Sequence, residues 1–253
     1  SYRQDTAIYT INDVDIVALC ELWHPGSGTG RSWSRDQIFD TIAAPLRNDY
    51  RYKGKIRYDQ GSMCIKVDLG IKVEILPVVY SAGNYDYTVE PFKLFRPENN
   101  GWEDGFARYH QQKLSEKNSQ AYSNFKPAIK VCKHLRSQFL LQAVSFHIEC
   151  LLYSLPSYLF KGSPAEYIPS VLSHIASISA TDWYGKIMRT PCGDRDIFTE
   201  AEWERSRWEA FHKAVVLWAT FAQAASQSVD RSGAIKLWQA LLGEDFFPQQ
   251  VGG

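Results

Sequence analysis

The chain has 253 residues, and its 28 Lys and Arg residues balance its 28 Asp and Glu residues, so the formal net charge is zero. Proteins that bind long nucleic acids usually carry an excess of basic residues, and this balance argues against such a partner. Hydrophobic residues make up 45% of the chain, and no apolar run approaches the ~20 residues of a transmembrane helix. We therefore expect a globular, non-membrane protein with one large domain or two closely packed lobes.

The first predicted strand contains Asp13 and Asp15 within an apolar run. Successive side chains of a strand point to opposite faces, so these two carboxylates share one face while Val14 and Ile16 share the other. Two ionised carboxylates this close repel each other unless a cation lies between them. Mg²⁺ or Mn²⁺ suits such oxygen ligands and leaves positions for substrate phosphates, as nucleotidyl transfer requires. Taken alone, an Asp-x-Asp pair is equally compatible with an exposed sheet edge.

A glycine-rich segment at residues 25–30 precedes a helix predicted at residues 34–46. The segment lacks the Gly-Lys-Ser/Thr ending of a phosphate-binding P-loop and follows the wrong element, so we interpret it as a flexible connection. The basic stretch at residues 47–57 is interpreted as a solvated strand edge. A second basic stretch, residues 126–136, falls in a helical pattern.

Two short strands are predicted between residues 62 and 79, joined by a tight turn at Gly70. Glu74 lies in the second strand, with Val73 and Ile75 on the opposite face. A site that binds two metal ions needs a third carboxylate from a neighbouring strand. Glu74 is our candidate, and Asp68 is the competing one, with a structural or surface role as its alternative.

The second half of the chain has mainly helical patterns. Residues 139–160 are apolar on nearly every face and predict one buried helix, which Pro156 bends or ends. Residues 203–227 predict a long helix entered through a capping box at residues 199–202. The Gly- and Pro-containing segment at residues 181–195 is interpreted as a loop or lid.

The cysteines and histidines show no metal-ligand spacing. The five cysteines stand singly, at residues 20, 64, 132, 150 and 192. This odd, scattered set predicts reduced thiols in a cytoplasmic protein rather than disulfides or a zinc site. His134 and His147 fall in helical patterns and are interpreted as packing or solvent-facing residues.

Several motifs, in the same order along the chain, carry a family resemblance. They are Ser-Tyr-Arg-Gln-Asp-Thr at residues 1–6 with Asp13-Val-Asp15, Val-Glu-Ile-Leu-Pro at 73–77, the segments 128–135 and 144–149, and the C-terminal segment 234–248. Together they resemble the CD-NTases, the bacterial nucleotidyltransferases related to cyclic GMP-AMP synthase and oligoadenylate synthase. The family has a glycine before the serine and a long helix before that, whereas the sequence given begins at the serine itself.

The resemblance implies an α+β fold with a polymerase-β-like mixed-sheet catalytic lobe packed on a C-terminal helical lobe. We expect the catalytic core at residues 1–120, the helical lobe at 121–248 and a flexible tail at 249–253. The implied ligands of two Mg²⁺ or Mn²⁺ ions, which are also the catalytic residues, are Asp13, Asp15 and Glu74. The implied nucleotide-binding residues are Ser1, Arg3, Thr6, Lys133, Ser145 and Phe146.

The roles within the nucleotide site differ. Lys133 would reach the donor triphosphate and Ser145 would contact phosphate, while Phe146, with Tyr153 or Tyr184, would stack on bases. Each has a structural alternative: Lys133 as a solvated helix lysine, Ser145 bonded to a backbone carbonyl, and Phe146 as a core residue.

The resemblance also implies an activity: synthesis of a cyclic di- or trinucleotide second messenger from NTPs, with release of pyrophosphate, in anti-phage (CBASS-type) defence. The product would activate a separate effector. The terminal Gly252-Gly253 suits attachment by a ubiquitin-transfer-like regulator, with a disordered tail as the alternative. Two other functions stay open: a same-fold transferase that makes linear oligonucleotides or nucleotidylates RNA or protein, and a nucleotide-binding pseudoenzyme.

Overall fold

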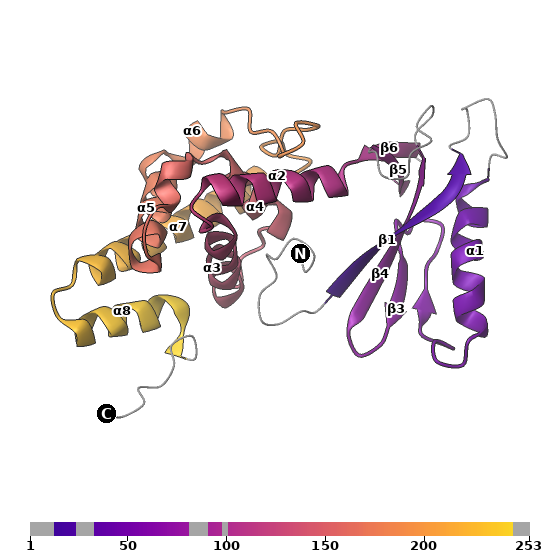
Figure 1. Ribbon diagram of the computed structural model, residues 1–253, viewed down its shortest axis with the longest axis horizontal. Helices are drawn as coiled ribbons and strands as arrows, with labels where there is room; N and C mark the ends of the chain where they lie inside the picture. The colour runs from indigo at the N-terminus through magenta and orange to yellow at the C-terminus, as the bar shows by residue number, and fades with distance from the viewer. Residues whose placement is uncertain (1–12, 24–32, 81–90, 98–100, 245–253) are drawn as a thin grey trace. The chain divides into compact units, whose positions relative to one another are not determined.

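The computed structural model describes residues 13–23, 33–80, 91–97 and 101–244 (Figure 1). The chain forms two compact units, one spanning Tyr9–Tyr109 and the other containing His110–Gly253. The division falls about ten residues before the boundary expected at residue 120. The reason is that helix α2 (Ala107–Gln120) buries Leu114 in the core of the helical unit.

The first unit is built on a mixed sheet, as expected. In its described part the strands are β1 (Asp13–Trp23), β2 (Ile56–Arg57), β3 (Ile65–Asp68), β4 (Lys72–Tyr80), β5 (Phe92–Arg96) and β6 (Gly101–Gly105). The strand order is β2-β3-β4-β5-β6, with antiparallel neighbours, and β1 pairs with β4 in parallel. The α+β, polymerase-β-like fold class is confirmed.

Helix α1 (Arg35–Asn48) lies alongside the sheet (Figure 1). Ser34 caps its first turn, because its hydroxyl accepts from the Gln37 amide while the Gln37 side chain accepts from the Ser34 amide. Phe39 and Ala43 are fully buried and pack with apolar residues of the sheet such as Val73. The helix expected at residues 34–46 is confirmed.

Arg35 ties the start of α1 to the loop that precedes β3. Its Nη2 donates to the carbonyl oxygens of Asp59, at 2.5 Å, and Ser62, at 2.7 Å. The guanidinium also lies 3.8 Å from the centre of the Phe39 ring. A planar guanidinium can donate hydrogen bonds from its edge while its face lies over an aromatic ring, so Arg35 fixes the loop against the helix.

The turn between β3 and β4 is as predicted. Gly70 has φ of 84°, a conformation that glycine adopts without steric cost. The Gly70 amide donates to Asp68 Oδ1 at 3.2 Å, so Asp68 stabilises the turn locally.

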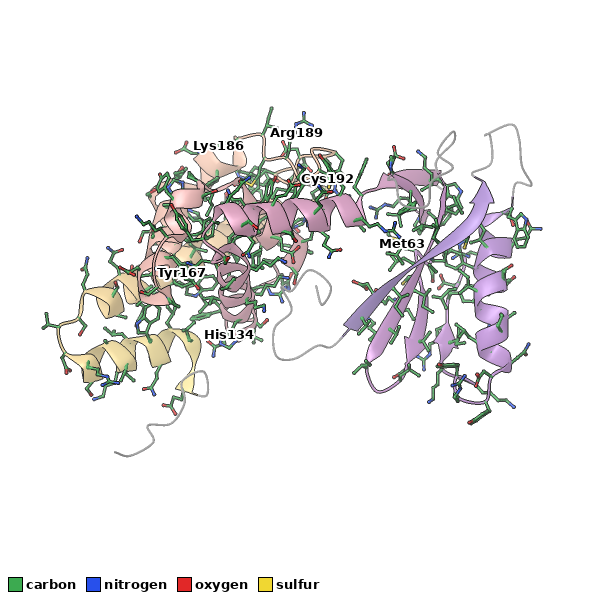
Figure 2. All side chains as sticks on the ribbon, viewed as in Figure 1. Met63, His134, Tyr167, Lys186, Arg189 and Cys192 are labelled. Atoms are coloured by element: carbon green, nitrogen blue, oxygen red, sulfur yellow. The ribbon has the colours of Figure 1, made fainter. Side chains whose placement is uncertain are left out.

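The second unit is helical. After α2 it contains α3 (Phe125–Gln138), α4 (Ser145–Ser154), the 3-10 helix η2 (Ser157–Phe160), α5 (Pro164–Ser177), α6 (Ala180–Tyr184), α7 (Arg205–Gln227) and α8 (Arg231–Leu242). Its core is strongly aromatic: Trp203, Trp208, Phe211 and Trp218 are buried and contact one another in tilted or edge-to-face pairs. Tyr167 of α5 joins the same core (Figure 2).

Three details of the helical prediction need correction. A single helix over residues 139–160 is wrong, because α3 ends at Gln138, Leu140 adopts φ of 51°, and α4 begins only at Ser145. The predicted end before Pro156 is confirmed. Thr199 Oγ1 does accept from the Glu202 amide at 3.3 Å, but α7 begins later, at Arg205, so this turn is not the cap of that helix.

The expected loop at residues 181–195 is helical at its start, where α6 runs through Tyr184, and irregular beyond it. All five cysteines are free thiols. Among the described residues, no helix is long and apolar enough to cross a bilayer.

Candidate active site

The two faces of the sheet differ in character because the side chains alternate. Val14, Val73, Val67 and Ile56 lie side by side across β1, β4, β3 and β2, and all four contribute to the apolar cluster beneath α1. The residues one position along point to the other face. The carboxylates predicted from the sequence lie on this second face.

Asp15 and Glu74 are direct neighbours across the parallel pair of β1 and β4. Asp15 is exposed, and the Glu74 side chain keeps 25% of its surface accessible. Lys72 Nζ lies 3.5 Å from Glu74 Oε1. The fold therefore brings these two predicted residues together, on a face that solvent and ligands can reach.

Asp13 is beside Lys72 in the same register. Its backbone position places it on the face of Asp15, two residues away, as the alternation predicted. Its side chain lies outside the described part of the structure, as do the whole of Ser1, Arg3 and Thr6.

The pKa of the Cys64 thiol is affected by the charged side chains of this region. Burial raises its pKa above the ordinary value, and the nearby negative charge of Glu74 raises it further, with a smaller contribution from Asp15. Cys64 is 7% exposed. The ammonium groups of Lys66 and Lys72 act in the opposite direction and lower the pKa, so carboxylates and cations both lie near this buried thiol.

The donor atoms fit a hard cation, since carboxylate oxygens are the ligands that Mg²⁺ and Mn²⁺ prefer. Among the side chains that the structure describes, no three His, Cys, Asp or Glu residues are grouped closely enough to hold a metal. Asp15 and Glu74 supply two ligand positions, and Asp13 is the residue whose backbone is placed to add a third.

Lys133 is buried within the helical unit and paired. Its Nζ lies 2.5 Å from Glu149 Oε1, and both side chains are at most 4% exposed. The other Glu149 oxygen lies 3.4 Å from His110 Nε2. Helices α2, α3 and α4 are thus joined by a buried polar cluster of His110, Lys133 and Glu149.

Glu149 was not predicted as the partner of Lys133. The signal was an acidic residue in the otherwise apolar segment Ile-Glu-Cys-Leu-Leu of α4. A buried charge in such a segment requires a counter-charge. The sequence does not say which helix supplies it.

Ser145 and Phe146 begin α4, next to this cluster. Ser145 Oγ accepts from Arg136 Nη1 at 3.2 Å. The Phe146 ring centre lies 5.1 Å from the ring centre of His110. The Arg195 guanidinium lies 5.2 Å from the centre of the same Phe146 ring. Phe146 therefore contacts the buried polar cluster that contains Lys133 through the His110 ring.

The two tyrosines named with Phe146 are structurally engaged. Tyr153 contacts Phe125 edge-to-face at 6.4 Å, and the Tyr184 hydroxyl donates to the Trp203 carbonyl at 3.1 Å. His134 Nε2 donates to the Leu242 carbonyl at 2.7 Å, and His147 stacks on Trp203 at 5.1 Å. These contacts agree with the packing role expected for both histidines (His134 in Figure 2).

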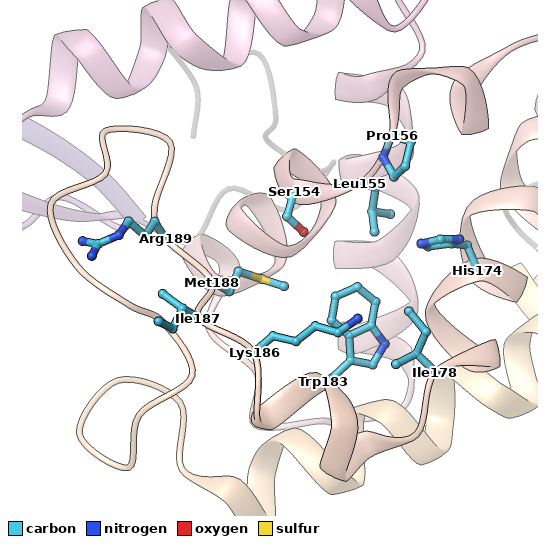
Figure 3. A pocket seen from close by; sticks show the side chains of 10 residues that line it. All are labelled: Ser154, Leu155, Pro156, His174, Ile178, Trp183, Lys186, Ile187, Met188 and Arg189. Atoms are coloured by element: carbon cyan, nitrogen blue, oxygen red, sulfur yellow. The ribbon is translucent and has the colours of Figure 1, made fainter.

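The helical unit also encloses a cavity of about 310 Å³ at the junction of α5, α6 and the following loop. Figure 3 shows Lys186 extended along the Trp183 indole, with Nζ 4.6 Å from the ring centre. The Trp183 indole N–H donates to the Ile175 carbonyl at 2.9 Å. None of the residues predicted to bind nucleotide lines this cavity.

A mixed sheet with one face packed on a helix, carboxylates on the other face and a following helical unit is the architecture of a nucleotidyltransferase. Residues 112–219 match the family model of the cGAS/DncV-like nucleotidyltransferase C-terminal helical domain. The chain is also 21% identical, over 247 residues, to cyclic UMP-AMP synthase of Rhodothermus marinus. That alignment covers 88% of this chain and 84% of the relative.

Solved structures agree on the fold. CdnE cyclic dinucleotide synthase of Elizabethkingia meningoseptica has a TM-score of 0.64 and 19% identity, with 84% of this chain and 80% of that one covered. Vibrio cholerae DncV cyclic AMP-GMP synthase has a TM-score of 0.70 and 12% identity, with 98% and 68% covered. Residues 112–219 therefore match a C-terminal helical domain of the cGAS/DncV-like nucleotidyltransferase type, and the fold of most of the chain is similar to that of these synthases.

Proposed function

We propose that this protein is a metal-dependent nucleotidyltransferase that joins NTPs into a cyclic di- or trinucleotide. The observation that carries the proposal is the pairing of Asp15 with Glu74 on the accessible face of the sheet, in a chain whose residues 112–219 match the helical domain of cGAS/DncV-like nucleotidyltransferases. The synthase names of its relatives support the same reaction class.

In the proposed reaction, a ribose hydroxyl of the acceptor nucleotide attacks the α-phosphorus of the donor. A new P–O bond forms, the bond to the bridging oxygen breaks, pyrophosphate leaves and the hydroxyl proton passes to water. Asp13, Asp15 and Glu74 would hold two Mg²⁺ or Mn²⁺ ions, which when bound supply positive charge beside the attacking and leaving oxygens. The carboxylates orient the site and keep its charge balanced.

The proposal also gives three residues of the helical unit a role in binding the donor nucleotide. Lys133 is assigned to the donor triphosphate, Ser145 to phosphate and Phe146 to a base. The Glu149 carboxylate, 2.5 Å from Lys133 Nζ, orients the ammonium group within the helical unit. Ser1, Arg3 and Thr6 complete the proposed phosphate site through backbone amides, hydroxyls and one guanidinium.

The proposal includes a signalling role in the cytoplasm, in anti-phage defence, with a separate effector that binds the product. One similar structure is described as a STING-associated CdnE c-di-GMP synthase from Capnocytophaga granulosa, and another as an E. coli CdnC:HORMA complex. These titles support a product-binding effector or a protein regulator as the partner classes. A ubiquitin-transfer-like regulator at Gly253 is a separate part of the proposal, and that residue lies outside the described structure.

The test is incubation of the protein with all four NTPs and Mg²⁺ or Mn²⁺, followed by phosphatase treatment and mass spectrometry. The matched control is the Asp13→Asn/Asp15→Asn variant. A cyclic product from the wild type and none from the control supports the proposal. A linear or macromolecule-linked product indicates the alternative transferase, and nucleotide binding without any product indicates a pseudoenzyme.

A further inference from the structure

The row of residues that contains Asp15 and Glu74 continues across the sheet. Lys66 of β3 is paired with Glu74, and Arg57 of β2 is paired with Lys66. The order across the four strands is therefore Asp15, Glu74, Lys66, Arg57, two acids followed by two bases. Residues in register share a face, so all four belong to the face opposite α1.

We propose that Lys66 and Arg57 form a subsite for the 5′-phosphates of the acceptor nucleotide. The inference rests on the proposed function and adds residues to it. The sequence stretch containing Arg57 was interpreted as a solvated strand edge, and the register gives part of that stretch a specific place beside the carboxylates.

The basic residues of this region divide into two groups. Arg47 lies 4.6 Å from the centre of the Tyr58 ring, and Arg51 Nη2 lies 2.6 Å from Asp49 Oδ2, so both cations are engaged within the protein. Lys66 and Arg57 are exposed, and within the described part of the chain neither side chain forms a hydrogen bond or ion pair. Glu74 is instead paired with Lys72. Two adjacent cations on one face therefore stay available to an anion.

The spacing suits a nucleotide that lies across the strands. Neighbouring strands are about 4.8 Å apart, which puts the backbone of Lys66 roughly 5 Å and that of Arg57 roughly 10 Å from Glu74. A ribose carries its reacting hydroxyl and its 5′-phosphates on opposite sides of the ring. With the hydroxyl at the carboxylates, the phosphates extend toward β3 and β2, where the charge along the row changes sign.

The occupant is the acceptor rather than the donor. The donor presents its α-phosphorus at the metal-binding carboxylates, and its triphosphate is already assigned to Lys133 and Ser145. The acceptor presents only a hydroxyl there, so its own phosphates require a second cationic surface. Lys66 and Arg57 supply this surface with long side chains that reach outward from the sheet.

The experiment separates the two substrates chemically. A 2′,3′-dideoxy-NTP acts only as donor, because it has no ribose hydroxyl to attack with. An α,β-methylene NTP acts only as acceptor, because its bridging carbon cannot leave. A plain nucleoside is an acceptor without phosphates. Each of these three compounds is tried with each of the four bases on the wild-type protein. The linear product is identified and quantified by mass spectrometry.

The test variant is Lys66→Ala/Arg57→Ala, and the control is Lys53→Ala, which removes an exposed charge from the turn before β2. We expect the double variant to lose about tenfold or more in kcat/KM for the phosphate-bearing acceptor, a typical effect of charge-assisted contacts. Its kcat/KM for the plain nucleoside and its KM for the donor should equal those of the control. An equal loss with both acceptors, or no loss, overturns the subsite.

A second measurement does not require turnover. Isothermal titration with inorganic tripolyphosphate should show at least tenfold weaker binding or one fewer site in the double variant than in Lys53→Ala. If the wild type makes no product at all, the proposed function fails while this titration still decides the subsite. Equal tripolyphosphate binding by the double variant and the control refutes it.

Discussion

Lys133 of α3 and Glu149 of α4 form an ion pair inside the helical unit, with Nζ 2.5 Å from Oε1 and both side chains almost fully excluded from solvent. Removing two charges from water is costly, and their mutual attraction only offsets that cost when both are present. His110 contacts the second oxygen of Glu149 and so completes the cluster. The pair therefore stabilises the helical unit only while both residues are present, since removing one leaves the other buried without the opposite charge of this ion pair.

The first prediction follows from this dependence. Glu149→Leu alone should lower the free energy of unfolding by about 3–5 kcal/mol, because it removes the carboxylate that pairs with the buried Lys133 ammonium. Lys133→Met/Glu149→Leu should regain most of that loss, because two apolar side chains of similar size fill the same space. Urea denaturation followed by circular dichroism measures both effects.

The same double variant separates structure from ligand binding. If Lys133 binds the donor triphosphate, Lys133→Met/Glu149→Leu folds well and yet binds a non-hydrolysable NTP at least tenfold more weakly than the wild type. Wild-type nucleotide affinity in that variant would show that Lys133 has a packing role only.

The second prediction concerns the carboxylates of the sheet. Asp15→Asn and Glu74→Gln should each reduce product formation by roughly a thousandfold or more, because amides cannot replace charged oxygen ligands of a divalent ion. Their thermal unfolding midpoints should stay close to that of the wild type, since both side chains are accessible. Asp13→Asn should behave alike. Product yield and thermal scans are compared for each variant.

Asp68 provides the matched comparison. It caps the Gly70 turn, and Asn can accept the same hydrogen bond from the Gly70 amide. Asp68→Asn should therefore retain activity, and a loss as large as that of Glu74→Gln would transfer the role of the third carboxylate to Asp68.

The local pattern of the sheet could be predicted from the sequence, but its long-range pairing could not. Alternation alone assigns Asp13 and Asp15 to one face and Val73 and Ile75 to the side opposite Glu74. That Arg57 falls in the same row depends on the β2–β3 and β3–β4 registers, which join residues far apart in the chain. The row of two acids and two bases was therefore not predictable.

In the helical unit, the helix boundaries and the burial of a charged residue could not be predicted from the sequence. Residues 139–160 are so uniformly apolar that periodicity could not locate the break between α3 and α4, which occurs where Leu140 has a positive φ. The motif at residues 128–135 predicted that Lys133 lies on a helix. The burial of Lys133, however, depends on how α2, α3 and α4 pack together. Sequence patterns predict faces of single helices and not the partner of a buried charge.

The third prediction concerns Phe146, which contacts His110 and Arg195 within the helical unit. Phe146→Leu keeps apolar volume but removes the aromatic face. If this ring stacks on a base, the dissociation constant for nucleotide should rise about fivefold or more, as expected for the loss of one stacked base. Inorganic tripolyphosphate binding should not change. The two ligands are compared by titration calorimetry.

Phe146→Tyr serves as the conservative control, because it retains an aromatic face. It should bind nucleotide much as the wild type does. If Leu, Tyr and Phe at this position bind nucleotide equally well, Phe146 is a packing residue at the start of α4 and another ring contacts the base.

The fourth prediction is a pH dependence of stability that arises from His147. Burial lowers the pKa of this imidazole below its ordinary value of 6.5, and the nearby positive charge of Arg195 lowers it further, while the contact with Glu202 opposes the shift. The unfolded chain then binds the proton more strongly than the folded one. Neutral His147 therefore makes its full contribution to stability above pH 6.5. That contribution decreases as the pH falls from 6.5 toward the lowered pKa of the folded state.

His147→Phe tests this dependence, since Phe can keep the stacking on Trp203 but does not titrate. The free energy of unfolding is measured by urea denaturation at several values between pH 7.5 and pH 5. The wild type should lose stability more steeply than His147→Phe as the pH falls below 6.5, whatever the difference at pH 7.5. Lys53→Ala, which leaves every imidazole in place, should follow the wild-type slope. Parallel slopes for His147→Phe and the wild type would show that this residue does not contribute to acid destabilisation.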